Sequence, residues 1–192
     1  MTLEILPVTA DRWDDLLALF GPNGAYSNCW CTWWIMSGKG FGEAEPGDRR
    51  ALLEGLVRDG HEPGLIAYQG GEPVGWCAVG PRERYLRMMS TRSATYRPVD
   101  EDPDNWVVNC FYLPKAQRKK GIATELLDAA IDYAFAHGAA SIDGYPRADT
   151  RHGASSLFVG TVSMFERAGF VEISRVRDRP LMRRVRSSIP TG

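Results

Sequence analysis

One stretch near the middle of the chain restricts the fold more than any other. Residues 106–113 form an apolar segment, residues 114–123 form a short cationic segment, and residues 124–137 have apolar side chains at helical spacing. The pattern predicts a strand, a loop and a helix in direct succession, with Gly138 ending the helix. The inward face of that helix is expected to consist of Leu126, Leu127, Ala130, Ile131 and Ala134.

The rest of the chain alternates between the same two kinds of element. Helices are predicted over residues 11–20, 48–59 and 157–168, and strands over residues 64–68, 73–79, 141–145, 171–177 and 181–186. The Gly70-Gly71 turn joins two of these strands in an antiparallel hairpin. Residues 81–104 are expected to be mostly loop, with a short helix near Tyr85 and Leu86. This order indicates the α/β (α+β) class, with a mixed sheet flanked by helices.

Length and composition favour one globular domain over residues 1–192. Hydrophobic residues make up 44% and charged residues 24% of the 192 residues, which is close to the globular average. The net charge of −1 argues against a surface built to bind nucleic acid. Neither a membrane span nor a secretory signal is present, so we expect no membrane partner and a cytoplasmic protein.

The four cysteines are expected to be reduced thiols. Cys29 and Cys31 are spaced like half of a metal site, but no second pair of cysteines or histidines stands at matching spacing, so no metal is expected. Cys77 and Cys110 fall in apolar strand segments, where a thiol behaves as a small buried hydrophobe.

An aromatic segment at residues 26–36 holds three of the six tryptophans. Two interpretations remain open. The rings could form part of the core, or they could form the wall of a pocket for an apolar or cationic ligand. The candidate substrate-binding residues are Tyr26, Trp30, Trp33 and Trp34.

The cationic segment before the central helix has the features of an anion site. A helix start offers unpaired backbone N–H groups and the positive end of the helix dipole, and Gly121 and Ala123 leave room for a diphosphate. A solvated basic loop is the alternative interpretation. The segment matches neither Gly-x-x-x-x-Gly-Lys-Ser/Thr nor Gly-x-Gly-x-x-Gly, which counts against ATP and NAD.

The segment resembles the acetyl-coenzyme A loop of the GCN5-related N-acetyltransferase (GNAT) superfamily. That loop reads Arg/Gln-x-x-Gly-x-Gly/Ala after a strand, and Arg118-x-x-Gly121-x-Ala123 fits it at every defined position. A second family pattern, Tyr-Glu-x-x-Gly-Phe, is similar to the six residues 165–170. The resemblance covers roughly residue 106 to the C-terminus, and it implies a GNAT-like, mostly antiparallel sheet.

The resemblance also implies a function. The chain would transfer an acetyl group from acetyl-CoA to a primary amine of a small molecule, by direct attack in a ternary complex. Backbone groups of residues 111–113 would pair with the pantetheine arm and polarise the thioester, and N–H groups of residues 119–124 would hold the diphosphate. The implied cofactor-binding residues are Phe111, Tyr112, Leu113, Arg118, Lys119, Lys120, Gly121, Ile122, Ala123 and Thr124.

The chain departs from the family at positions that carry acid–base groups. Phe165 replaces the usual tyrosine, Phe158 replaces a helix asparagine, and Val107 stands where some members carry a glutamate. Proton transfer therefore needs other groups, and the candidates are Asn109, Tyr145 and Thr161. Strand alternation places Asn109 on one face with Val107, Phe111 and Leu113. Each candidate also has a purely structural interpretation, as a hydrogen-bonded asparagine, a packed tyrosine and a packed threonine.

Two other functions fit the same resemblance. The acceptor could be a protein N-terminus or a lysine, or the chain could be a non-catalytic acyl-CoA-binding module. The expected oligomeric state is monomer or homodimer. The arginines of residues 175–186 mostly alternate along the predicted strands, which is typical of a solvated face.

Overall fold

The computed structural model describes residues 3–90, 102–148 and 158–187, and its centre is one seven-stranded sheet with the order β1-β2-β3-β4-β5-β7-β6. Only β4 and β5 run parallel, and every other neighbouring pair is antiparallel. The expected mixed and mostly antiparallel sheet is therefore confirmed. The strands are β1 (Glu4–Pro7), β2 (Gly64–Gln69), β3 (Glu72–Pro81), β4 (Asn105–Tyr112), β5 (Ser141–Gly144), β6 (Val171–Val176) and β7 (Arg179–Val185).

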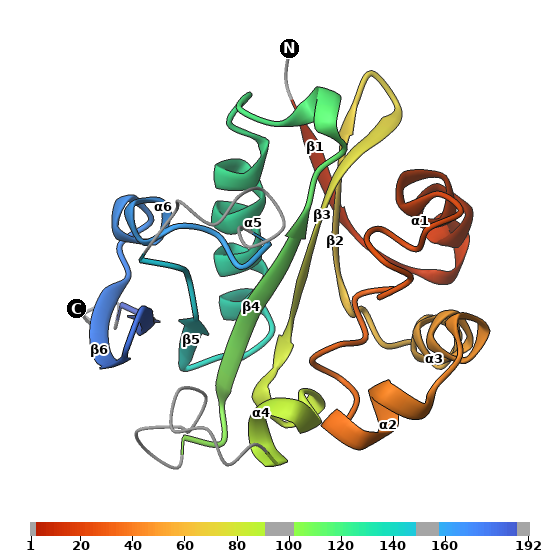
Figure 1. The fold of residues 1–192 in the computed structure, drawn as a ribbon. Coiled ribbons are helices and arrows are strands. Elements are labelled where there is room, and N and C mark those ends of the chain that lie inside the picture. Colours follow the sequence, from red (N-terminus) through yellow and green to blue (C-terminus); the bar gives the residue numbers. More distant parts are fainter. Residues whose placement is uncertain (1–2, 91–101, 149–157, 188–192) are drawn as a thin grey trace.

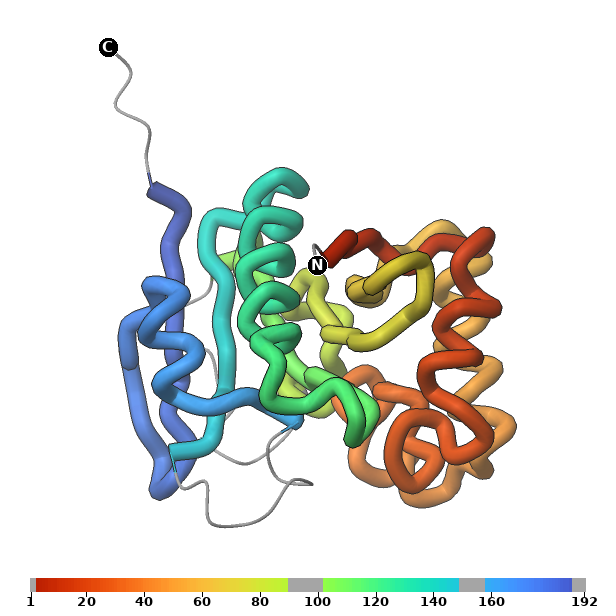
Figure 2. Tube along the Cα trace, turned by 90° about the horizontal axis from the view of Figure 1, so that it is seen from above, coloured from red at the N-terminus to blue at the C-terminus, as the bar shows by residue number. Residues whose placement is uncertain are grey.

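Helices cover both faces of the sheet (Figures 1 and 2). One face is covered by α5 (Ile122–Ala136) and α6 (Val162–Arg167), and the opposite face of β2 and β3 by α1 (Trp13–Phe20) and α3 (Pro46–Arg58). Two short helices, α2 (Gly38–Glu43) and α4 (Leu86–Ser90), lie near the lower end of the sheet in Figure 1. Among the described residues, no helix is long and apolar enough to cross a membrane.

The central helix forms as its sequence predicts. The five apolar residues expected to face inward, Leu126, Leu127, Ala130, Ile131 and Ala134, are all buried against the sheet. Burial of such a face supplies most of the stability of a helix in a protein. The β2–β3 hairpin and the short helix after Tyr85 are likewise confirmed.

Strand β4 contains a β-bulge. Its pairing with β3 steps from Phe111 directly to Asn109, so Cys110 is an extra residue, and it has a left-handed φ of 51°. Such a bulge reverses the alternation of the side chains beyond it. On its other side β4 pairs with β5 only from Asn105 to Val107. Beyond Val107 the two parallel strands therefore separate.

The observed elements differ from the predicted ones at three places. The helix predicted over residues 157–168 is short, since α6 begins at Val162, after Gly160, whose φ of 79° interrupts a helix. Strand β1 was not predicted, although it pairs with β2 along its length. Helix α2 was also not predicted, because its sequence Gly38-Lys39-Gly40-Phe41-Gly42-Glu43 is rich in glycine. Residues 91–101, part of the predicted loop, lie outside the described residues.

Candidate active site: two cavities beside the separated strands

The start of α5 carries the unpaired amides expected of an anion site. Gly121 is the N-cap in a left-handed conformation with φ of 85°, and Lys119, two residues earlier, has φ of 63°. The amides of Gly121, Ile122 and Ala123 have no hydrogen-bond acceptor among the described residues, whereas that of Thr124 donates to the Gly121 carbonyl. Three N–H groups therefore remain for a ligand at this helix end.

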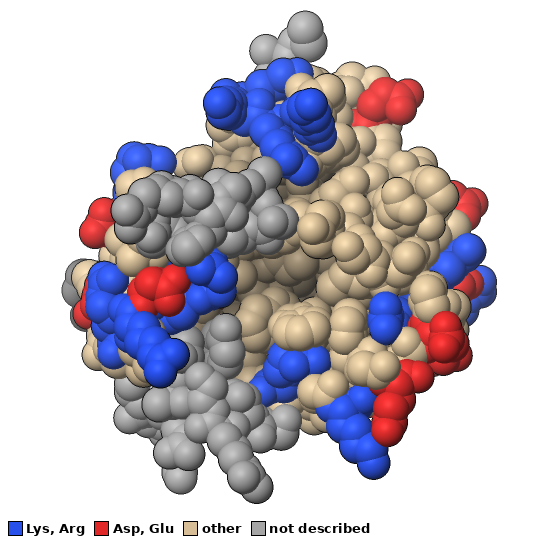
Figure 3. Space-filling model, in the orientation of Figure 1, with Lys and Arg blue, Asp and Glu red and all other residues tan. Residues whose placement is uncertain are grey.

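Exposed cations surround this helix end. Lys115, Arg118, Lys119 and Lys120 are all exposed. Basic side chains gather over the loop between β4 and α5, at the top of the molecule in Figure 3. The amides and the cations together suit the negative charge of a diphosphate. The residues present therefore fit the phosphate end of coenzyme A.

A cavity of about 360 Å³ begins at this helix end and follows β4. Most of its walls are apolar, and the cations Arg118 and Lys119 also line it. This lining fits a ligand with a charged part and a less polar arm. The lining residues are Phe111, Leu113, Arg118, Lys119, Ala123, Phe158, Gly160, Thr161 and Met164.

Two backbone groups of the strand expected to contact the cofactor already have partners. The amide of Phe111 donates a hydrogen bond to the carbonyl oxygen of Phe158, and Nε of Arg118 donates to the carbonyl oxygen of Leu113 at 3.1 Å. A ligand that accepts from the Phe111 amide has to replace the Phe158 carbonyl, whereas the Leu113 carbonyl has a second lone pair for another donor. The cofactor roles of both residues stay predictions.

A second, smaller cavity of about 60 Å³ lies on the other side of Phe158. Its walls are Ala25, Tyr26, Cys29, Cys31, Cys110, Tyr112 and Phe158. The rings of Phe158 and Tyr26 are in contact, with centroids 5.3 Å apart. Phe158 therefore separates a large cavity beside α5 from a small cavity beside the aromatic segment.

The structure divides the aromatic segment between core and surface. Trp30 is buried with Phe20 and Trp76 under α1, and Trp34 is buried in another cluster with Tyr85. Trp33 is 42% exposed and stacks on the Arg87 guanidinium, whose carbon lies 3.7 Å from the ring centroid. Of the four candidate substrate-binding residues, Tyr26 lines the small cavity, and it is 52% exposed.

The prediction that Asn109, Phe111 and Leu113 share a face of β4 is wrong. Phe111 and Leu113 pack with α5, whereas Val107 packs on the opposite face with Tyr85 and Tyr145. The bulge at Cys110 changes the face between Asn109 and Phe111. Asn109 is 2% exposed, and neither atom of its amide group has a partner among the described residues. A buried amide without partners is costly, so this side chain is a candidate to bind a ligand or a water.

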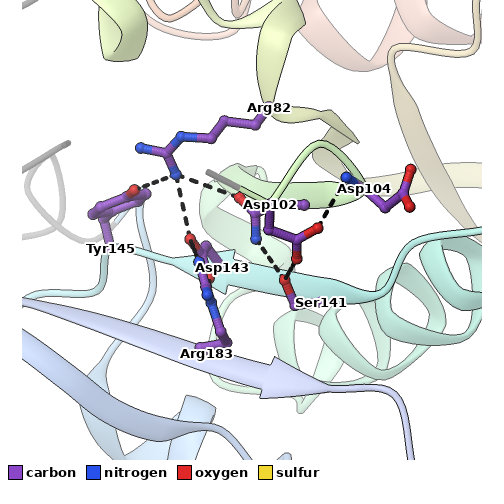
Figure 4. A network of polar contacts seen from close by, with 8 residues as sticks. Arg82, Asp102, Asp104, Ser141, Asp143, Tyr145 and Arg183 are labelled. Atoms are coloured by element: carbon purple, nitrogen blue, oxygen red, sulfur yellow. Dashed lines mark hydrogen bonds and ion pairs between the residues drawn. The ribbon is translucent and has the colours of Figure 1, made fainter. Parts of the chain in front are cut away.

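Tyr145 belongs to a buried polar network (Figure 4). Its hydroxyl accepts a hydrogen bond from Nη1 of Arg82 at 2.7 Å, and the same nitrogen lies 3.3 Å from Asp143. Arg183 binds the Asp143 carboxylate through two nitrogens, at 2.6 and 3.0 Å. Burial raises the pKa of Tyr145 to about 12, so its hydroxyl stays protonated at neutral pH.

Thr161 stands at the edge of the large cavity. It is the N-cap of α6, and its hydroxyl lies 3.4 Å from that of Ser163. The three candidates for proton transfer therefore lie at different places. Thr161 lines the large cavity, and Asn109 is buried on the opposite face of β4. Tyr145 is hydrogen-bonded within the buried polar network. Phe165 is fully buried, and its ring packs so closely on Gly144 that a Cβ there would overlap it.

Several residues of the site were not found by sequence reasoning. The pair Asp143 and Arg183 contradicts the expectation that the arginines after residue 175 form a solvated face, since Arg183 is 7% exposed. An aspartate inside a short buried strand could have indicated a buried cation. Cys110 is half-buried at the bulge rather than packed in a regular strand. Among the described residues, no three potential ligands gather as a metal site.

Solved structures resemble the whole fold. PaiA N-acetyltransferase from Thermoplasma acidophilum, in complex with coenzyme A, has a TM-score of 0.53 and 14% identity, covering 97% of this chain and 100% of that one. Diaminobutyrate acetyltransferase EctA from Paenibacillus lautus, in complex with L-2,4-diaminobutyric acid and coenzyme A, has a TM-score of 0.52 and 14% identity, covering 95% and 93%. Ribosomal-protein-alanine N-acetyltransferase from Brucella melitensis has a TM-score of 0.52 and 19% identity, covering 95% and 99%.

Because these structures are less than 25% identical to the chain in sequence, their similarity shows the fold alone. The family is assigned from the match of the sequence to a family pattern. No curated protein sequence matches the chain. The sequence pattern of the Acetyltransferase (GNAT) family matches residues 30–170, which is most of the chain. The match includes β4, the cationic loop, α5 and α6. The chain therefore belongs to the Acetyltransferase (GNAT) family.

Proposed function

We propose that this protein transfers an acetyl group from acetyl-CoA to a primary amine of a small molecule, by direct attack in a ternary complex. The observation that carries the proposal is the pair of cavities on either side of Phe158. The large one begins at the cationic start of α5 and suits the cofactor. The small one, bounded by Tyr26 and Cys110, leaves room for a compact acceptor group.

The start of α5 would hold the cofactor. The amides of Gly121, Ile122 and Ala123 would donate to the diphosphate, and Arg118 and Lys119 would add positive charge at the same end of the cavity. When bound, acetyl-CoA supplies an acetyl group activated as a thioester.

The reacting end would lie where β4 leaves β5. The Phe111 amide would donate to the thioester oxygen, where negative charge develops during attack. Asn109 would orient the amine or a water that takes its proton, since its buried amide group has no partner among the described residues. The Thr161 hydroxyl would donate to the departing sulfur. A thiol with a pKa of about 8.5 leaves readily at neutral pH, so the loss of the tyrosine at Phe165 does not prevent transfer.

The test is a panel of acceptors with acetyl-CoA, in which release of the free thiol is followed. The panel holds small primary amines, diamines, amino acids and a peptide with a free N-terminus and a lysine. Saturable turnover with a small amine supports the proposal. Turnover with the peptide alone would contradict it in favour of protein acetylation, and tight acetyl-CoA binding without turnover would indicate a non-catalytic module.

Tyr26→Ala tests whether the small cavity takes the acceptor. The variant should raise the KM for the amine severalfold and leave the KM for acetyl-CoA unchanged, because Tyr26 lines the small cavity and is not among the residues that line the large one. Val185→Ala is the matched control, since Val185 is similarly exposed, at 62%, on the distant strand β7. Equal effects of the two substitutions would contradict an acceptor site at Tyr26.

A further inference from the structure

The thiols of Cys31 and Cys110 lie against each other, although the two residues are 79 positions apart in the chain. Their sulfur atoms are 3.1 Å apart. Cys31 belongs to the aromatic segment between α1 and α2, whereas Cys110 is the bulge residue of β4. The contact therefore joins the segment that bounds the small cavity to the strand that bounds the large one.

Backbone conformation fixes this contact. Both residues have left-handed φ angles, 52° at Cys31 and 51° at Cys110, which are uncommon for a residue with a side chain. The bulge turns Cys110 toward the face of the sheet on which Cys31 packs. A disulfide bond is about 2.05 Å long, so the two sulfur atoms need to approach by only about 1 Å to bond.

The two thiols differ in their access to solvent. Cys31 is 4% exposed, whereas Cys110 is half-buried, and both line the small cavity that shares Phe158 with the cofactor cavity. The hydrogen bond with the Cys110 thiol, followed by burial, raises the pKa of Cys31 well above its usual range. Cys110 is therefore the thiol that an oxidant meets first, with Cys31 as its partner.

We propose that Cys31 and Cys110 form a redox site, in which a hydroperoxide converts the two thiols into an intramolecular disulfide. The Cys110 sulfur attacks the peroxide, whose O–O bond breaks; Cys110 becomes a sulfenic acid and one water leaves when hydrogen peroxide is the oxidant. The Cys31 sulfur then displaces the hydroxyl from Cys110 as a second water. The two thiols lose two electrons in total, and a dithiol reductant restores them.

The cross-link would connect the segment that bounds the proposed acceptor cavity to the strand that bounds the proposed cofactor cavity. It would link the aromatic segment to β4 between Asn109 and Phe111, the two residues of this strand that are proposed to act in the transfer. The other two cysteines have no such role. Cys77 is fully buried and packs on the opposite face with α5, and Cys29 lines the small cavity without a sulfur partner among the described residues.

The experiment treats the full chain with hydrogen peroxide, blocks the remaining thiols by alkylation and maps the peptides by mass spectrometry. The parent and Cys29→Ser should give one linked pair, Cys31 with Cys110, with the loss of two hydrogen atoms and full reversal by dithiothreitol. Cys31→Ser should give no link and should accumulate oxidised Cys110. No link in the parent, or a link that includes Cys29 or Cys77, would overturn the assignment.

A thermal melt of the same samples checks that the link forms in the folded chain. The oxidised parent should melt at a higher temperature than the reduced parent, because the link restricts the unfolded chain, and Cys31→Ser should show no such increase. An unchanged or lower melting temperature of the linked parent would mean that the bond distorts the fold, and would overturn the assignment. Neither result depends on the identity of the acceptor amine.

Discussion

The backbone amide of Phe111 donates its hydrogen bond to the carbonyl oxygen of Phe158. This bond spans the opening where β4 and β5 separate, because β5 pairs with β4 no further than Val107. Phe111 lies directly after the bulge at Cys110, which leaves its N–H directed away from β3. The proposed role of this N–H in catalysis requires that the thioester oxygen takes the place of the Phe158 carbonyl.

The first prediction concerns this exchange of partners. In an amide NMR spectrum, the Phe111 signal should move further on addition of acetyl-CoA than on addition of coenzyme A, which lacks the thioester carbonyl. The amide of Trp106, on the regular part of the same strand, serves as the internal control and should move equally little with both. Identical responses of Phe111 to the two ligands would rule out the exchange.

A second prediction concerns the buried network of Figure 4. Asp143→Asn should lower the free energy of unfolding by about 3–5 kcal/mol, because it leaves Arg82 and Arg183 buried without their shared carboxylate. Urea unfolding measures the change. Asp178→Asn is the control; it removes a partly exposed ion pair with Arg147, and should cost less than about 1 kcal/mol. Similar losses in the two variants would contradict a structural role of Asp143.

The third prediction is a dependence of stability on alkaline pH. Burial raises the pKa of Cys29 from 9.0 to about 11. Between these values the unfolded chain releases the thiol proton and the folded chain retains it, so stability present below pH 9 is lost as the pH rises toward 11. The loss of stability from this thiol is about 3 kcal/mol.

Cys29→Ser tests this dependence, because serine does not titrate in the same range. Urea unfolding at several pH values should show a shallower alkaline decline in the variant than in the parent. The remaining decline comes from the other buried thiols and phenols, such as Cys77. Parallel curves for parent and variant would show that Cys29 titrates alike in the folded and unfolded chains.

The periodic parts of the fold could be predicted from sequence, and the irregular parts could not. Helix α5 and the β2–β3 hairpin carry strong local signals, an apolar stripe in the first and a Gly-Gly turn in the second. Asn109 was predicted to share a face of β4 with Phe111 and Leu113, which is wrong because one extra residue at Cys110 reverses the alternation beyond it, and the sequence pattern does not reveal that residue. Helix α6 was predicted too long because the apolar side chains before it belong to a turn at Gly160.

The same distinction between local and long-range features applies to the candidate site. The start of α5 could be located because its chemistry is local: a glycine N-cap, unpaired amides and cations within a few residues. The contacts of Phe158 with Phe111, of Cys31 with Cys110 and of Asp143 with Arg183 join residues about 40 or more positions apart. Such contacts follow from the order of strands in the sheet, which the sequence pattern alone does not determine.

Calorimetric titration with acetyl-CoA tests the central claim most directly, on the parent, Gly121→Glu and Gly138→Glu. The two glycines stand at opposite ends of α5, have similar left-handed φ angles of 85° and 93°, and have open space around them, so the two substitutions strain the backbone alike. Thermal melts verify that both variants fold. The parent and Gly138→Glu should bind acetyl-CoA with similar affinity, and Gly121→Glu should bind at least about tenfold more weakly, a loss of about 1.4 kcal/mol. Absence of binding in the parent, or equal binding in both folded variants, would contradict a cofactor site at the start of α5.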